Sequence, residues 1–351
     1  MDRALRQRTA FLLLLLAAMV ADADEPLTQP MRVAEPARLA ARALLIAIAP
    51  AGPHLVAVGD RGVIVLSDDR GASWTQAEYV PTQALLTGVC FLDAAHGVAV
   101  GHDEVILATA DAGRHWQRTH YAPEAQRPLL DVWCSNGDTV IAVGAYSAYF
   151  TSTDRGASWR AVKFAPVAAA AAGAGAAGVN TDAAAGGGYH LNRIVSGGGG
   201  QRLYIAAEAG HLYRSDDAGG TWRTLASPYE GSFFGVLPLA GEAVLAFGLR
   251  GHLYRSADAG GSWQPIETGT VAMLTGATAF DSGALAVVGL SGVVLVSRDA
   301  ARSFILLQQA DRVGLSAVAP VGDERLAVVG EGGARLVTVS DRPGAAVAAA
   351  P

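Results

Sequence analysis

Short apolar blocks alternate with short polar turns along most of the chain. Residues 45–49 form an apolar block, and residues 54–59 and 63–67 form two more, separated by an Asp-Arg-Gly turn. Trp74 opens a fourth block that is shorter and more polar. Apolar runs of four to eight residues between turn signals are typical of β-strands. Residues 45–76 therefore predict a unit of four short antiparallel strands.

This unit recurs, and its clearest mark is the sequence SDDRGASW at residues 67–74, which we call the box. Its copies lie at 109–116, 152–159, 215–222 and 256–263, and a worn copy lies at 297–304. The central aspartates are Asp69, Asp111, Asp154, Asp217, Asp258 and Asp299; the glycines two residues later are Gly71, Gly113, Gly156, Gly219 and Gly260; the closing tryptophans are Trp74, Trp116, Trp159, Trp222 and Trp263, with Phe304 in the worn copy.

The aspartates are 42, 43, 63, 41 and 41 residues apart, as their numbers show by subtraction. First strands of the later units are expected at Leu86–Phe91, 130–134, Leu191–Ser196, 234–239, 274–280 and Leu315–Pro320. A seventh unit, marked by Val328 to Asp341, keeps the preceding glycine as Gly330 but lacks a box. Four-stranded units of 40–45 residues are typical of propeller blades. The fold class predicted is all-β, a seven-bladed β-propeller of four-stranded blades over residues 43–341.

Three segments lie outside this repeat. An Ala/Gly-rich insert at 167–188 accounts for the spacing of 63, and we expect a loop there. Residues 342–351 form an Ala-rich tail. The last unit has only three strands, so we expect residues 31–35, within the N-terminal segment 24–42, to supply the missing outer strand and close the ring.

The N-terminus predicts export. Residues 1–23 combine three arginines, an apolar stretch and an Ala-Asp-Ala site, which is the pattern of a signal peptide. We expect a periplasmic or otherwise exported protein, in the thylakoid lumen if the source is photosynthetic, and a monomer without a transmembrane segment after cleavage. The formal net charge of -6 argues against a nucleic-acid partner.

The two cysteines, Cys90 and Cys134, leave two alternatives open. Exported proteins commonly pair their cysteines. However, each cysteine lies four residues after a leucine, Leu86 or Leu130, so the repeat places both at equivalent positions that point the same way. A disulfide needs Cα atoms within about 7 Å. The repeat therefore favours two buried thiols over a bridge.

The box has a structural task that needs no ligand. An aspartate in a hairpin can accept hydrogen bonds from backbone N–H groups of its own turn. The glycine permits a positive φ, and the indole can fill the gap between adjacent sheets. A device needed once per blade is expected to be repeated, whereas a catalytic group is needed once. We expect no metal and no cofactor at these aspartates; cation or sugar binding is the alternative.

The stretch from Gly59 to Trp74 resembles the bacterial neuraminidase repeat, or Asp-box. Its regular spacing after Ala-Val-Gly strands most resembles the photosystem II stability and assembly factor family. This resemblance covers about residues 43–340. It implies an exported seven-bladed propeller that acts as a scaffold in the assembly of a membrane or envelope protein complex, without enzymatic activity.

The face opposite the boxes is the expected binding surface. In propellers, the turns between second and third strands share a face with the loops between blades. Aromatic and arginine side chains are enriched in interface cores. The candidates for partner binding are Arg61, Tyr79, Tyr121, Arg127, Tyr146, Tyr229, Arg250 and Arg312.

A sialidase-like glycoside hydrolase or a carbohydrate-binding propeller is the competing hypothesis, because Asp-boxes also occur in sialidases. Such a site needs an arginine cluster and a tyrosine nucleophile with a glutamate partner. Candidate residues are Arg61, Arg193, Arg250 and Arg312 with Tyr79, Tyr121 and Tyr229. The sialidase Arg-Ile-Pro start is absent, and the eight histidines show no zinc-binding spacing.

Overall fold

The computed structural model describes residues 32–168, 188–197 and 199–339. The expected signal peptide at 1–23, most of the insert and the tail at 342–351 lie outside these residues. Among the described residues, no helix is both long and apolar enough to cross a membrane.

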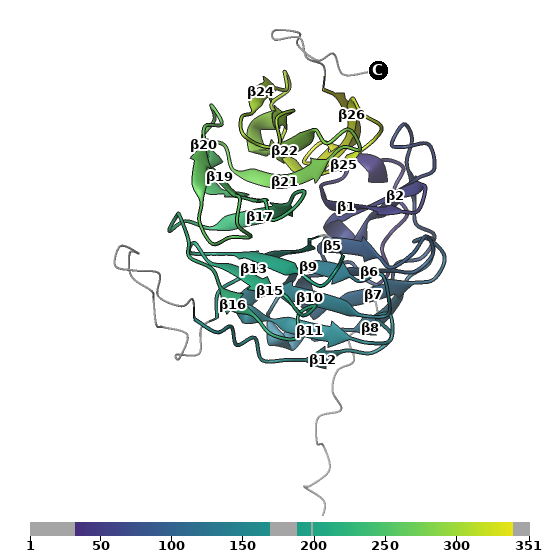
Figure 1. Ribbon diagram of the computed structural model, residues 1–351. Coiled ribbons are helices and arrows are strands. Elements are labelled where there is room, and N and C mark those ends of the chain that lie inside the picture. Colours follow the sequence, from purple (N-terminus) through teal and green to yellow (C-terminus); the bar gives the residue numbers. More distant parts are fainter. Residues whose placement is uncertain (1–31, 169–187, 198, 340–351) are drawn as a thin grey trace, which may run out of the picture. The chain divides into compact units, whose positions relative to one another are not determined.

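Seven antiparallel sheets stand around a ring, and the first strand of each lies nearest the centre (Figure 1). The seven-bladed propeller is therefore confirmed. Blades one to three comprise β1 (Leu45–Ala51), β2 (His54–Gly59), β3 (Ile64–Ser67) and β4 (Thr75–Gln76); β5 (Leu86–Phe91), β6 (Gly97–Gly101), β7 (Ile106–Thr109) and β8 (Gln117–His120); β9 (Leu129–Cys134), β10 (Val140–Gly144), β11 (Tyr149–Ser152) and β12 (Arg160–Ala161).

Blades four to seven comprise β13 (Leu191–Ser196), β14 (Leu203–Ala207), β15 (Leu212–Ser215) and β16 (Arg223–Thr224); β17 (Phe233–Pro238), β18 (Val244–Gly248), β19 (Leu253–Ser256) and β20 (Gln264–Ile266); β21 (Leu274–Ala279), β22 (Leu285–Gly289), β23 (Val293–Ser297) and β24 (Ile305–Gln308); β25 (Leu315–Pro320), β26 (Arg325–Gly330) and β27 (Gly333–Thr338). Short 3-10 turns are η1 (Ala40–Arg42), η2 (Asp60–Gly62), η3 (His102–Glu104), η4 (Pro123–Ala125), η5 (Ala145–Ser147), η7 (Leu249–Gly251) and η8 (Leu290–Gly292).

The seventh blade has three strands within the described part of the chain. The expectation that residues 31–35 complete it is wrong for the residues that are described. The Ala34 N–H donates to Val80 O at 2.9 Å, and the Gln76 side chain bonds to both Glu35 O and Ala37 N. Residues 34–37 are therefore bound along the outside of blade one, because Gln76 offers them both a donor and an acceptor.

The glycine that ends most second strands is required by close backbone approach. A Cβ built on Gly59 would lie 2.0 Å from Leu44 O, and one on Gly248 would lie 2.2 Å from Ser232 O. These carbonyls belong to the segments that enter each blade, so a side chain would push the incoming chain away. The recurrence of glycine ten residues before the box aspartate follows from this contact.

The apolar core lies between neighbouring blades, and each box aromatic packs against the blade before its own. Trp116 is fully buried in one cluster with Val56 and Leu66 of blade one. Trp74 of blade one lies partly buried in clusters with Val329 and Ala327 of blade seven, which closes the ring by packing. The aromatic residues thus join consecutive blades in one direction around the ring.

Polar side chains of the inner strands add hydrogen bonds between blades. The hydroxyl of Thr87 donates to Leu129 O at 2.7 Å, and that of Thr275 donates to Leu315 O at 2.7 Å. In blade three the position that matches Thr87 is Leu130, which has no hydroxyl, and the next residue, Asp131, makes the inter-blade hydrogen bond. The buried Asp131 carboxylate accepts the Ile194 N–H at 2.9 Å.

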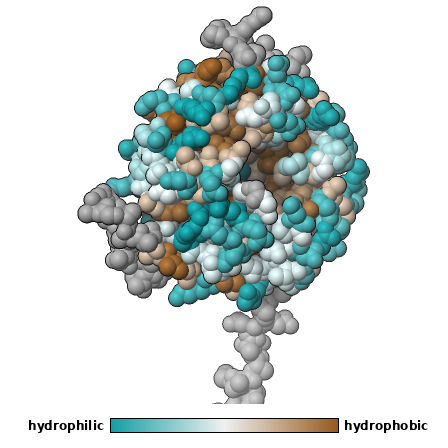
Figure 2. Space-filling view, viewed as in Figure 1, coloured by the Kyte–Doolittle hydropathy of each residue, from teal (hydrophilic) through white to brown (hydrophobic). Residues whose placement is uncertain are grey.

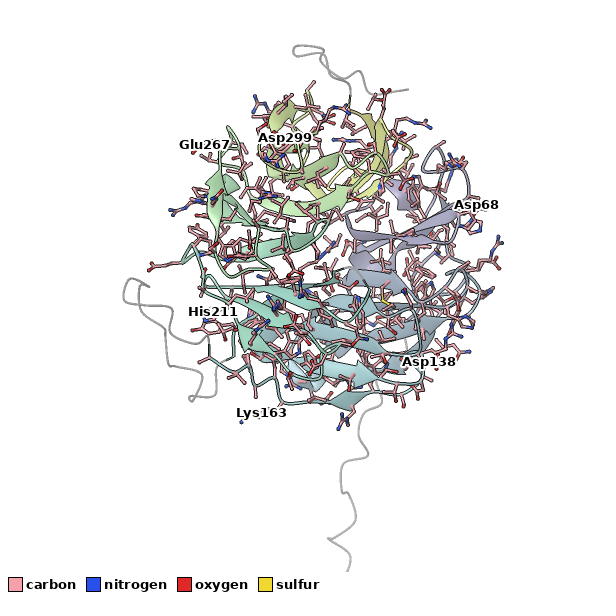
Figure 3. All side chains as sticks on the ribbon, viewed as in Figure 1. Asp68, Asp138, Lys163, His211, Glu267 and Asp299 are labelled. Atoms are coloured by element: carbon pink, nitrogen blue, oxygen red, sulfur yellow. A yellow bond between two sulfur atoms is a disulfide. The ribbon has the colours of Figure 1, made fainter. Side chains whose placement is uncertain are left out.

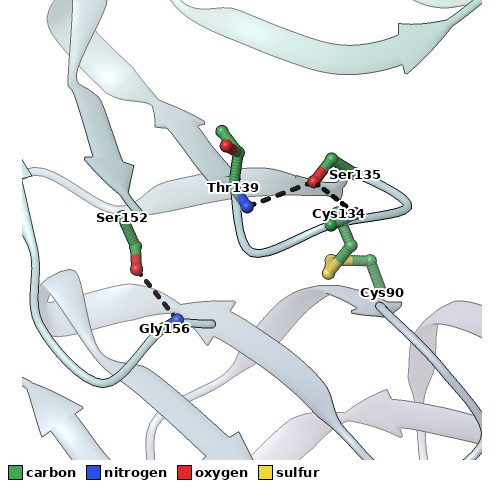
Figure 4. Close-up of a disulfide and its surroundings, with 7 residues drawn as sticks. Cys90, Cys134, Ser135, Thr139, Ser152 and Gly156 are labelled. Atoms are coloured by element: carbon green, nitrogen blue, oxygen red, sulfur yellow. Dashed lines mark hydrogen bonds between the residues drawn. A yellow bond between two sulfur atoms is a disulfide. The ribbon is translucent and has the colours of Figure 1, made fainter. Parts of the chain in front are cut away.

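Cys90 and Cys134 form a disulfide, with Cα atoms 5.7 Å apart (Figure 4). The expectation of two unpaired thiols is wrong, because the two cysteines do not occupy equivalent positions in the repeat. Leu86 pairs with Gly101 in blade two, and the matching residue in blade three is Leu129, which pairs with Gly144. Cys134 therefore lies one position further along its strand than Cys90.

Successive side chains of a strand point to opposite faces of its sheet, so this offset turns the two cysteines towards each other. Both belong to the cluster between blades two and three. Phe91 and Trp133, their immediate neighbours, pack on the opposite sides, in the clusters of blades one and two and of blades three and four.

Candidate partner-binding surface

The box hairpins are tied together by their own side chains. Asp69 Oδ1 accepts the Ser73 N–H at 2.8 Å, and Asp69 Oδ2 accepts the Ser73 hydroxyl at 2.6 Å. The Ser67 hydroxyl donates to the same carboxylate and accepts the Gly71 N–H at 2.7 Å. The Trp74 indole N–H then donates to Gly71 O at 3.2 Å. The bonds to the carboxylate recur around the central aspartates of the other five boxes. In the second box, His115 takes the place of Ser73. The bond from the indole to the box glycine is absent from the fourth, fifth and sixth boxes, all of which lie within the described residues.

These hydrogen bonds favour the ionised carboxylate. Bonds from the Ser73 hydroxyl and N–H lower the pKa of Asp69 to about 2, and those from Ser158 lower the pKa of Asp154 to about 2. The glycines adopt φ values near 84° to 91°, as at Gly71 and Gly113. The carboxylate oxygens of the boxes therefore accept hydrogen bonds from within their own hairpins.

The opposite face is defined by a contact repeated in all seven blades. The first residue of the turn between second and third strands donates its N–H to the segment that enters the blade. The bonds are Asp60 to Leu44, His102 to Leu85, Ala145 to Pro128, Glu208 to His190, Leu249 to Ser232, Leu290 to Met273 and Glu331 to Gly314, all between 2.9 and 3.2 Å. We call these turns and linkers the turn face.

The tips of these turns hold residues in the left-handed backbone region. Arg61, Tyr146 and Arg250 have φ values of 51°, 53° and 57° and are exposed. The Arg61 side chain is 87% exposed, and Tyr146 is 56% exposed against the edge of His190. These three predicted residues therefore project to solvent from blades one, three and five.

The linkers place three other predicted residues on the same face. Tyr121 is held over the Arg118 guanidinium at 4.4 Å, and the next residue, Ala122, bonds to Asp103 O in the turn of blade two. Arg312 is exposed in the linker between blades six and seven. Tyr229 is half-buried and stacked on His252 at 4.3 Å.

Tyr79 lies elsewhere than expected. It pairs with His115 in the box hairpin of blade two, and the Trp116 N–H donates to Tyr79 O at 3.0 Å. The linker between blades one and two therefore passes beside that box, and Tyr79 belongs to the box face. Its grouping with the turn-face residues was wrong.

Arg127 is bound to a residue that the sequence did not single out. Its Nε lies 2.7 Å from Oε1 of Glu104, and His120 Nε2 lies 3.3 Å from Oε2 of the same carboxylate. The Arg127 contact is out of line for a directed hydrogen bond, so it acts as an ion pair. Glu104 is only 2% exposed, and at 48° its φ is left-handed.

The repeat itself contained the signal for Glu104. The third position of this turn is glycine in all blades except two and three, and a Cβ at Gly62 or Gly251 would lie 2.1 Å from a linker carbonyl. Blades two and three have Glu104 and Ser147 there. Their side chains occupy the space that the linker takes in other blades, so the outgoing linker follows a different path.

The surface in view combines an apolar centre with a hydrophilic rim. Apolar residues gather around the hollow near the middle of the viewed face, and hydrophilic residues cover most of its periphery (Figure 2). Asp68, Asp138 and Lys163 project at the edge of the same view (Figure 3).

The residues proposed for a sialidase-like site do not assemble into one. Arg193 lies 3.6 Å from the buried Asp131, while Arg61, Arg250 and Arg312 are exposed in the turns and linkers of blades one, five and six. In that part of the chain, no group of His, Cys, Asp or Glu is arranged to hold a metal ion.

The comparisons with known proteins agree with the resemblance seen in the sequence. Residues 66–186, about a third of the chain, match the family model described as photosynthesis system II assembly factor YCF48. Comparison with curated protein sequences gives no match. The resemblance to assembly-factor propellers is confirmed by this match.

Three solved structures share the fold at low sequence identity. One, described as YCF48 bound to D1 peptide, has a TM-score of 0.64 at 14% identity, over 86% of this chain and 94% of that one. YCF48 from Cyanidioschyzon merolae has a TM-score of 0.63 at 17% identity, over 85% and 96%. A GH74 xyloglucanase from Xanthomonas campestris has a TM-score of 0.65 at 16% identity, over 86% of this chain and 53% of that one. At these identities, all three structures show the fold alone.

Proposed function

We propose that this protein is an exported, non-enzymatic scaffold that binds a subunit of a membrane or envelope complex during assembly. The match of residues 66–186 to the photosystem II assembly factor family carries this proposal. In a photosynthetic source, photosystem II would be the complex.

A peptide segment is the form of partner that the comparisons favour. A propeller of the same fold is described as bound to D1 peptide. The turn face of this chain offers exposed arginines and tyrosines on backbone held by the seven repeated hydrogen bonds. Such pre-ordered side chains lose little freedom when they bind a partner.

The disulfide supports the exported location. Disulfides persist in oxidising compartments and are rare in the cytosol. The Cys90–Cys134 bridge joins the inner strands of two blades. Together with the pattern of residues 1–23, it favours the periplasm or an equivalent compartment.

Capture of partners from solubilised membranes tests the proposal. Replacing Arg61, Arg250 and Arg312 by alanine should reduce crosslinking and co-purification of a membrane protein at least tenfold, with unchanged thermal stability. The matched control replaces three exposed box-face arginines, Arg70, Arg114 and Arg302, by alanine, and should leave capture intact. Equal capture by both triple variants would refute the turn face as the binding surface. Turnover of fluorogenic glycosides by the wild-type protein would instead favour the hydrolase alternative.

A further inference from the structure

A groove on the box face lies between blades four and five, away from the turn face. Its lining includes Arg202, Tyr204, Arg214, Asp216, Leu239 and Glu242, and its volume is about 490 Å³. Ligand sites for small molecules commonly enclose about 300–1,000 Å³. The groove is therefore large enough for a small organic molecule.

Three guanidinium groups converge on one carboxylate at this groove. Asp216 is contacted by Arg202 Nε at 2.9 Å, by Arg214 Nη2 at 3.0 Å and by Arg223 Nη2 at 2.5 Å. Glu242 of blade five meets Arg202 Nη1 at 2.5 Å. Arg202 and Arg214 line the groove with both carboxylates, and Arg223, which is outside the lining, adds a third cation through Asp216, so the five-residue cluster has one surplus positive charge.

The surplus charge is held close to the groove. The Arg214 side chain is only 14% exposed and also donates to Ala259 O, and Arg202 is 30% exposed. Arginines held in place by other contacts bind carboxylate and phosphate oxygens with geometric specificity. The apolar part of the lining, with Pro238 and Leu239, would cover an uncharged portion of the same ligand.

The repeat provides an internal comparison that separates this cluster from a fold-forming device. Arg255 of blade five matches Arg214 and likewise bonds to the carbonyl of the next box, at Ala300 O. The residue that matches Asp216 is Ala257, so blade five has the arginine without the charge cluster. A blade therefore forms without the cluster of three arginines, and blade one has a single pair, His54 with Asp68, at the positions that match Arg202 and Asp216.

We propose that this groove binds a small organic anion, a carboxylate or phosphate ester with an apolar body. Arg202 holds the anionic group and is positioned by Asp216, while Leu239 and Pro238 contact the apolar body. The site is independent of the partner surface, so each proposal can fail alone.

Binding of benzoate and phenyl phosphate to the full-length protein, followed by ligand-observed NMR titration, tests this site. Both probes should bind saturably, whereas inorganic phosphate, which lacks the apolar body, and benzyl alcohol, which lacks the charge, should bind at least tenfold more weakly. A preference between the two anionic probes distinguishes the carboxylate from the phosphate ester. Saturable binding of neither probe would overturn the proposal.

Variants with opposite expected effects sharpen the test. Arg202→Gln should weaken binding at least tenfold. Glu242→Gln removes a competing carboxylate that is 58% exposed, and should strengthen binding severalfold without affecting folding. The control Arg155→Gln breaks a comparable box-face ion pair, with Asp93, and should leave binding unchanged. Unaltered affinity in Glu242→Gln would contradict the role of the charge surplus even if Arg202→Gln failed to fold.

Discussion

Cys134 lies one strand position beyond the equivalent of Cys90, and this single offset brings the two sulfur atoms together across blades two and three. Had both occupied the same position, both side chains would face in the same direction around the ring. The bridge therefore links two consecutive inner strands that share no backbone hydrogen bonds, since each belongs to its own sheet.

Removal of the bridge should lower the free energy of unfolding. A disulfide that closes a loop of this size restricts the unfolded chain, and its loss costs about 2–5 kcal/mol. The double variant Cys90→Ser with Cys134→Ser should show that loss in urea denaturation. Reductant should destabilise the wild type and have no effect on the variant. Equal stability of the two oxidised proteins would show that packing alone joins these blades.

The box aspartates should make the fold acid-sensitive in a defined window. The pKa of Asp69 and of Asp154 is lowered to about 2 by hydrogen bonds from Ser73 and Ser158, against an ordinary value of 3.8. A depressed pKa contributes stability that is present above about pH 4 and is lost as the pH falls towards 2. Thermal denaturation between pH 5 and 2 should show this decline. Asp154→Asn should make it shallower, and an unchanged slope would contradict the assignment.

The fully buried indole of blade two should matter more than the partly buried one of blade five. Trp116 has no exposed surface, whereas Trp263 is only partly buried. Truncating a buried aromatic residue typically costs about 3–5 kcal/mol because a cavity remains. Trp116→Ala should approach that loss in chemical denaturation, and Trp263→Ala should cost clearly less. A reversed order would show that the aromatic packing between blades is misassigned.

Asp131 should be sensitive to loss of its acceptor oxygen. Its carboxylate accepts the Ile194 N–H, and Asp131→Ala leaves that group unpaired between blades three and four, at a cost of about 1–3 kcal/mol. Asp131→Asn keeps an acceptor and should cost less. Urea denaturation of the two variants measures the difference, and equal losses would show that the hydrogen bond is unimportant.

The charge of Asp131 should also give the opposite pH dependence from the boxes. Burial raises the pKa of Asp131, with Arg193 opposing the shift. A raised pKa favours the protonated form in the folded state, so this group contributes stability at acidic pH and loses it as the pH rises through the folded pKa. Asp131→Asn has no ionisable group at this position, so its stability should not fall in this way as the pH rises. Comparing its unfolding free energy with that of the wild type at pH 5 and 8 checks the sign.

The fold was predictable because each blade repeats the same local signals. Gly59 marks a close backbone approach, Asp69 marks a self-bonded hairpin, and Trp74 marks an inter-blade contact. The first two depend on residues that are near one another in the sequence, and the third recurs at the end of every box. The strands that begin at Leu129 and Phe233 were predicted to begin one residue later, because each of these residues is followed by a second apolar residue.

The surface was less predictable because its contacts join distant segments. The pairing of Tyr79 with His115 and the ion pair of Glu104 with Arg127 depend on the paths of linkers that carry no repeated signal. The groove beside Arg202 joins residues from two blades. Departures from the repeat, such as glutamate where other turns have glycine, were the one available clue to such places.

Trp74 finds its packing partners about 250 residues later, at Ala317, Val329 and the neighbouring residues of the last blade. During synthesis, the first blade therefore emerges with one flank uncovered, and it stays so until the final strands arrive. Contacts between such distant segments slow folding. The nascent protein thus presents an apolar flank for as long as translation continues.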